Sequence, residues 1–185
     1  DAMKLFLSDD EKEVILAAKA LNEQNEERKQ IEAKVYDEAI EQVESNNRPL
    51  KWQITNTKGP VVVYSQNWHP GVLGIVAGKL AAHFSRSTIV FAQDPMNHEN
   101  VRGSGRAFGE FDLFDAVEKV SELCESFGGH KKAAGLVVSK KNLPKFMELL
   151  ESKCVEESSK DDDTCKLVDN DAIDVDMVIP FAKIS

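Results

Sequence analysis

The chain has 185 residues, which is enough for one ordinary domain with an extension or for two small ones. Its apolar fraction of 42% is typical of a globular protein, and neither a membrane span nor a signal-peptide pattern is present, so we expect a cytoplasmic protein without membrane contact. The net charge of −9 disfavours nucleic-acid binding, because phosphates are contacted by Lys and Arg.

The first predicted element is a long helix. Residues 8–11, "SDDE", form a capping-box pattern with Ser8 as N-cap and Glu11 as its partner. Apolar residues recur at helical spacing in 14–21 and 31–43, whereas 22–30 are polar on every face, and "SNNRP" at 45–49 ends the helix. The pattern suits a strut between two packed bodies, with an ordinary surface helix as the alternative.

Strands and helices then alternate. The patterns predict strands at 61–65, 87–93 and 101–108, helices at 69–84, 111–127 and 142–157, and a loop and strand within 125–138. In the helix at 111–127 we expect Asp112 as cap, with Cys124 and Phe127 on the buried face. This order indicates an α/β fold, a mixed β-sheet flanked by helices and preceded by a long connecting helix. A solvated linker follows at 157–164, and 172–179 alternate as a strand does.

Glycines mark one helix face. Gly71, Gly74 and Gly78 are spaced i, i+3 and i+7, and each glycine inside a helix costs about 1 kcal/mol relative to alanine. A sheet or a neighbouring helix packing very close is the favoured explanation. The turn around Trp68 and His69 borders a ligand in the alternative reading.

Two glycine-broken stretches are candidates for a phosphate site. In "RGSGR" (102–106), Ser104 offers a hydroxyl, Gly105 a bare backbone and Arg106 a fork that matches phosphate oxygens. In "FGGHKKAAG" (127–135), glycines free the backbone beside a histidine donor; the candidates are Gly128, Gly129, His130, Ala134 and Gly135. The surroundings are locally basic, with Arg102, Lys131, Lys132, Lys140 and Lys141 between two acidic regions. The alternative explanation of these two sequences is a tight turn for the glycines and a purely structural role for the histidine.

Other chemistries lack their patterns. His69, His83, His98 and His130 show no metal-ligand spacing, and the chain has no P-loop and no nucleophile elbow. Three cysteines without a CxxC spacing favour neither a disulfide framework nor a zinc site. We therefore expect no metal or other cofactor bound by this segment itself.

Three separated motifs carry a family resemblance. "FGGHKKAAG" resembles the GGHxxAAG signature of the DHHA1 domain, which accompanies the catalytic domain of DHH-family phosphoesterases. "WHPGVLGIVAGKL" (68–80) and "GSGRAFGEFDL" (103–113) resemble the RecJ-type 5′→3′ exonucleases specific for single-stranded DNA. The resemblance implies that 1–48 are the end of a catalytic domain and a connecting helix, 49–157 a DHHA1 substrate-binding domain, and 158–185 a linker and the first strand of an oligonucleotide-binding domain.

The resemblance also implies roles. Members of that family hydrolyse phosphodiester bonds of single-stranded DNA in repair and recombination, with Mn²⁺ or Mg²⁺ held by an Asp-His-His motif that this chain lacks, so the segment alone is expected to be inactive. Ser104 and Arg106 would hold a phosphate near the 5′ end. Gly129 and His130 would line the scissile phosphate, where His130 donates a catalytic hydrogen bond. Trp68 would stack on a base or, alternatively, anchor the helix start.

Two other functions stay open. One is a DHH-family phosphodiesterase that acts on short oligonucleotides or cyclic dinucleotides. The other is a non-catalytic interaction module related to RecJ. Single-stranded DNA is the expected partner, with other DNA repair proteins as further candidates.

Overall fold

The computed structural model describes residues 2–44 and 59–158. The predicted linker at 157–164 lies outside these residues except for 157 and 158, which are helical, and the predicted final strand at 172–179 lies outside them, as does the segment 45–58. Within the described part no helix is both long and apolar enough to cross a membrane.

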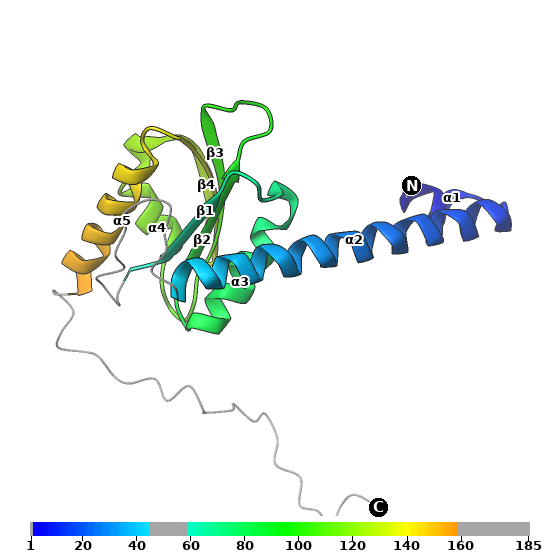
Figure 1. The fold of residues 1–185 in the computed structure, drawn as a ribbon, viewed down its shortest axis with the longest axis horizontal. Coiled ribbons are helices and arrows are strands. Elements are labelled where there is room, and N and C mark those ends of the chain that lie inside the picture. The colour runs from blue at the N-terminus through cyan, green and yellow to red at the C-terminus, as the bar shows by residue number, and fades with distance from the viewer. Residues whose placement is uncertain (1, 45–58, 159–185) are drawn as a thin grey trace, which may run out of the picture.

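A five-stranded mixed sheet forms the centre of the fold (Figure 1), which confirms the predicted class. The strands are β1 (Val61–Ser65), β2 (Thr88–Gln93), β3 (Asn100–Arg106), β4 (Cys124–His130) and β5 (Ala133–Ser139), in the order β1-β2-β3-β5-β4. β1 and β2 are parallel because helix α3 (Leu73–Phe84) connects them, whereas the remaining pairs are antiparallel. β3 is therefore an interior strand and β4 an edge strand.

Helices cover the two faces of the sheet separately. One face packs against α3, the preceding 3₁₀ helix η1 (Pro70–Val72) and the end of α2, around core residues such as Leu73, Leu80 and Val90. The other face packs against α4 (Leu113–Glu118) and α5 (Leu143–Ser158), around Phe91 and Phe146. Their rings meet edge to face with centroids 5.8 Å apart. Each face thus has its own apolar core.

Helix α2 (Glu11–Glu44) is a 34-residue rod that follows the short helix α1 (Ala2–Leu7). Figure 1 shows its C-terminal part lying along α3 while its N-terminal part extends away from the sheet. The predicted Ser8 capping box is wrong, because the helix begins at Glu11 and the Lys12 N–H bonds to Oδ1 of Asp10 at 2.9 Å. Ser8 instead bonds to the Asp10 N–H and to Glu13.

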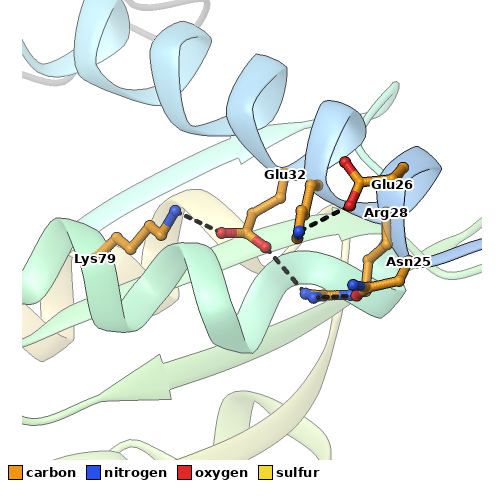
Figure 2. A network of polar contacts seen from close by, with 6 residues as sticks. Asn25, Glu26, Arg28, Glu32 and Lys79 are labelled. Carbon is orange, nitrogen blue, oxygen red and sulfur yellow. Dashed lines mark hydrogen bonds and ion pairs between the residues drawn. The ribbon is translucent and has the colours of Figure 1, made fainter. Parts of the chain in front are cut away.

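Polar contacts fix α2 on α3. The Glu32 carboxylate, on a residue only 6% exposed, accepts a bond from Nζ of Lys79 on α3 at 2.6 Å and one from Nη1 of Arg28 at 3.0 Å (Figure 2). Beside it, Val35 and Ala39 are buried against the same helix. The C-terminal part of α2 is therefore packed in a defined position against α3.

The predicted helix at 111–127 is wrong beyond residue 118. Asp112 does cap α4, since its Oδ1 accepts a bond from the Asp115 N–H at 3.0 Å. A 3₁₀ helix, η2 (Ser121–Leu123), then leads into β4, so Cys124 and Phe127 lie on a strand. Hydrogen bonding to β5 outweighs the local helical spacing of the apolar residues.

Candidate nucleic-acid interface

The site lies where β3, β5 and β4 run side by side under the start of α3. Register partners in antiparallel strands point to the same face, and so do alternate residues of one strand. Three rows of side chains consequently cross the α3 face of the sheet: Arg106–Ala133–His130, then Ser104–Gly135–Gly128, then Arg102–Val137–Ser126.

The second and third rows form the floor of an open groove of about 510 Å³. Pro70, Leu73 and Gly74, from η1 and the first turn of α3, make one wall. On the opposite side the groove is bounded by the edge strand β4. An extended ligand in the groove would meet no large side chain over the row Ser104–Gly135–Gly128.

Arg106 fits under the glycine face of α3. A Cβ on Gly74 would lie 2.8 Å from its Nη2, and a Cβ on Gly78 would lie 3.9 Å from its Cγ. Close packing on the sheet therefore explains the helix glycines, and the neighbour that needs the space is this arginine. Nη1 donates to the Gly105 carbonyl at 2.8 Å and weakly to Oγ of Ser104 at 3.4 Å. None of the described carboxylates forms an ion pair with Arg106, which leaves N–H groups of the fork for an anion.

His130 ends β4 in the same row as Arg106, two strands away, or about 9.5 Å between Cα positions. Its ring is exposed, and Nδ1 accepts the Lys132 N–H at 3.3 Å. In the neutral ring the proton then lies on Nε2, which can donate to a phosphate oxygen. Arg106 and His130 thus lie on the same face of the sheet, on β3 and β4 with β5 between them, in the row next to the groove lining.

Glycine is required at position 129 by the fold but not at position 128. Gly129 has φ +151°, and a Cβ there would lie 2.2 Å from the Ala133 carbonyl oxygen, so the fold itself demands glycine. A Cβ on Gly128, or on its partner Gly135, would meet no described atom within 4 Å, and neither residue has a positive φ. Packing and backbone conformation leave both of these glycines unexplained.

Three predicted site residues, Gly105, Gly129 and Ala134, belong to the face of the sheet opposite the groove. A Cβ on Gly105 would lie 2.7 Å from Leu113, and Ala134 is 3% exposed in the core beneath α4 and α5. Because side chains alternate along a strand, neighbours of Ser104 and Gly135 in sequence face the opposite core. The backbone of β3 is also paired with β2 on one side and β5 on the other. The prediction that a ligand contacts the main chain at Gly105 is therefore wrong, because these N–H groups are used within the sheet.

Trp68 is an anchor and has no open ring face. The side chain is 4% exposed, and its Nε1 donates to Oε2 of Glu38 on α2 at 2.8 Å. The base-stacking prediction is therefore wrong, and the alternative reading, an anchor for the helix start, is the one that the structure shows.

The predicted basic patch is divided. Lys131 and Lys132, in the turn between β4 and β5, both pair with Glu110, at 3.0 and 3.6 Å. The hydrogen bond and charge of Lys131, followed by the charge of Lys132, lower the pKa of the Glu110 carboxyl. Lys140 and Lys141 follow β5 at the other end of the hairpin. Of the described cations, Arg102 lines the groove, and Arg106 lies in the adjoining row beside Ser104.

Two polar residues of the groove, Arg102 and Ser126, are not among the predicted site residues. The sequence pattern places Arg102 only in the basic patch and gives no signal for Ser126. Both follow from period-two alternation once 102–106 and 124–130 are recognised as strands. Across the described ranges no three His, Cys, Asp or Glu side chains gather as metal ligands.

Comparisons with known proteins show the family of the chain. The DHHA1 domain matches residues 58–156. The single-stranded-DNA-specific exonuclease RecJ of Bacillus subtilis is 34% identical over 143 residues, covering 77% of this chain and 17% of that protein. RecJ of Escherichia coli is 32% identical over 148 residues, covering 78% of this chain and 25% of its own length. The chain thus spans a quarter or less of these relatives.

Solved structures show the same fold. RecJ from Thermus thermophilus in complex with Mg²⁺ superposes with a TM-score of 0.70 at 24% identity, over 84% of this chain and 22% of that one. An exonuclease RecJ bound to manganese gives a TM-score of 0.68, also at 24% identity, over 83% of this chain and 35% of that one.

Proposed function

Because the chain belongs to the DHHA1 domain family, we propose that it is the strand-binding portion of a RecJ-type exonuclease specific for single-stranded DNA. The relatives named above carry that activity in their names, and 77–78% of this chain matches 17–25% of their length. In this proposal the protein works in the cytoplasm in DNA repair and recombination.

One observation carries the proposal: the unexplained glycines of the groove floor. Gly128 and Gly135 are register partners, and nothing described in the structure fills the space above them. A residue type that costs backbone entropy in a strand, and that its own fold does not need, indicates a binder from outside. A sugar–phosphate backbone resting on this row would come within van der Waals contact of the main chain.

The bordering residues supply the chemistry for a phosphate. Arg106 presents a planar fork with Ser104 beside it, and charge-assisted bonds of this kind are about twice as strong as neutral ones. His130 donates from Nε2 to a non-bridging oxygen, where it stabilises the negative charge that develops during hydrolysis. The role of Gly129 is to place His130 at the end of β4.

A divalent cation belongs to another part of the protein in this proposal. The RecJ structures named above contain Mg²⁺ or manganese, which would activate water for phosphodiester hydrolysis. The described residues of this chain offer no ligand cluster for such an ion, so none of them is given a metal role. This chain holds and orients the strand.

The test adds one methyl group to the groove floor. Gly128→Ala and Gly135→Ala should leave the melting temperature unchanged or raise it, and should weaken binding of a 5′-phosphorylated dodecathymidylate by about tenfold. Fluorescence anisotropy at several salt concentrations measures the affinity, and Gly78→Ala, whose Cβ lies outside the groove lining, is the matched control. If both groove variants bind as tightly as the control, the strand does not pass over this row.

Catalysis needs the complete polypeptide. Arg106→Ala there should cripple degradation of 5′-phosphorylated single strands, and unchanged turnover would remove the role given to Arg106. Turnover of dinucleotides in preference to long strands would instead favour a small-substrate phosphodiesterase. An upstream reading frame without Asp-His-His would favour an interaction module without hydrolysis.

A further inference from the structure

The third row of the groove repeats the chemistry of the first two. Arg102 lies on β3 two residues from Ser104, on the same face, and Ser126 lies opposite it on β4 across Val137. Both line the groove. The Ser126 hydroxyl has no hydrogen-bond partner among the described residues and is exposed. The row therefore presents a guanidinium and a hydroxyl on its two banks, with an apolar floor between them.

A buried carboxylate forms a long ion pair with Arg102. Nη2 of Arg102 lies 3.5 Å from Oδ2 of Asp94, whose side chain is only 6% exposed although that of Arg102 is 51% exposed. The Met96 N–H donates to the other carboxylate oxygen at 2.9 Å, which fixes Asp94 in the turn after β2. One nitrogen of the fork thus lies at the limit of hydrogen-bonding distance from Asp94, and the remaining N–H donors of this groove-lining residue have no partner among the described residues.

The spacing of the rows suits consecutive phosphates. Two residues along an antiparallel strand span about 6.8 Å. A stacked nucleic-acid strand rises about 3.4 Å per nucleotide, and an unstacked, extended strand has a longer repeat. One extended nucleotide therefore covers the step from the Ser104 row to the Arg102 row.

We propose that Arg102, aimed by Asp94, binds a second phosphate of the strand, one nucleotide along from the phosphate held by Ser104 and Arg106. Ser126 donates to the same phosphate from the opposite bank. This inference rests on the proposed function and deepens it, because a groove with two phosphate sites binds a strand of two or more nucleotides more tightly than a mononucleotide. Asp94 is a positioning residue that does not touch the strand.

Competition binding with this 185-residue chain tests the second phosphate. A labelled, 5′-phosphorylated dodecathymidylate is displaced by thymidine 5′-monophosphate, which has one phosphate, or by the 5′-phosphorylated dithymidylate, which has two. In the unaltered chain the dinucleotide should compete better. Arg102→Gln should reduce this advantage about tenfold and lower the salt slope for the dodecamer by about 0.7, the value for one phosphate contact of a single strand.

The control is Lys145→Gln, the same loss of charge on an exposed residue of α5 on the opposite face of the sheet. Arg106→Gln should weaken both competitors. If the unaltered chain binds neither competitor nor the dodecamer, the proposed function fails. If it binds, and Arg106→Gln weakens binding while Arg102→Gln behaves as Lys145→Gln does, only the second-phosphate site fails.

Asp94→Asn distinguishes two roles of Asp94, because they change the affinity for DNA in opposite directions. Removal of an acidic charge near the groove would tighten DNA binding if Asp94 acted only by repulsion. If Asp94 aims Arg102, the variant loses about threefold in affinity for the dodecamer while its salt slope stays unchanged, because the arginine keeps its charge. Tighter binding by Asp94→Asn would overturn the positioning role.

Discussion

The fit between Arg106 and α3 makes a prediction that separates stability from binding. Gly74 faces the guanidinium so closely that an added Cβ would lie 2.8 Å from Nη2 and 3.1 Å from Oγ of Ser104. Both atoms are at the ends of flexible or small side chains, so Gly74→Ala should fold. Gly78, one turn later on the same face, tolerates a Cβ at 3.9 Å from Cγ of Arg106.

The magnitudes follow from these distances. An ordinary contact begins near 3.4 Å, so the guanidinium must move by at least 0.6 Å in Gly74→Ala. A hydrogen bond to a charged group contributes about 1.5–3 kcal/mol, and loss at the lower end of this range is roughly tenfold in Kd. Gly78→Ala keeps the guanidinium in place and gains up to about 1 kcal/mol of helix propensity, or roughly 2–4 °C in Tm for a chain of this size.

Anisotropy with a 5′-phosphorylated single strand and thermal unfolding measure the two effects in the same preparations. We expect Gly74→Ala to bind about tenfold more weakly at an undiminished Tm, and Gly78→Ala to bind as the parent does at a raised Tm. Equal affinities for the two alanine variants would show that the guanidinium under α3 is not the phosphate ligand.

Three further predictions concern the surrounding structure. Lys79→Met leaves the buried Glu32 carboxylate with Arg28 as its cation and should lower the free energy of unfolding by about 1–2 kcal/mol in urea titrations; no change would mean that the pair does not hold α2. The Met96 N–H and then the charge of Arg102 lower the pKa of Asp94, so its contribution to stability is present above the unfolded pKa of about 3.9 and is lost as the pH falls through the folded pKa. The stability difference from Asp94→Asn should shrink on acidification, and a constant difference would contradict this. Burial raises the pKa of the Cys124 thiol to about 11, so its alkylation at pH 8 should be at least tenfold slower than that of a free thiol with a pKa of about 8.5; alkylation at the rate of the free thiol would refute it.

The sequence was sufficient where local pattern and tertiary environment agree. The apolar runs that became β1 and β2, and the helix that connects them, were predicted within a residue or two at most boundaries. The failure at 124–130 has a physical cause. Leu123 and Phe127 continue the spacing of the preceding helix, and only the hairpin with β5, a contact between segments, makes this stretch a strand.

The candidate site was predicted as contiguous motifs, and the sheet divides those motifs between its faces. Ser104 and Arg106 face the groove while Gly105 faces Leu113, although all three belong to one motif. Period-two alternation alone would have made this division. The sequence cannot show why glycine is needed at 129 but not at 128, since this depends on which atoms lie near each glycine in the folded chain.

Helix α3 joins the strut to the site. Lys79 on one of its faces holds Glu32 of α2, while Gly74 and Gly78 on another face receive Arg106. A rotation or shift of α3 would therefore change the dock of α2 and the space around the guanidinium together. Since Trp68 also bonds to Glu38 of α2 just before η1, the wall of the groove is tied to the strut at two points. In the proposed enzyme, whatever the far end of α2 packs against would be held in a fixed orientation to the phosphate-binding rows, which is what a cleft between two bodies requires.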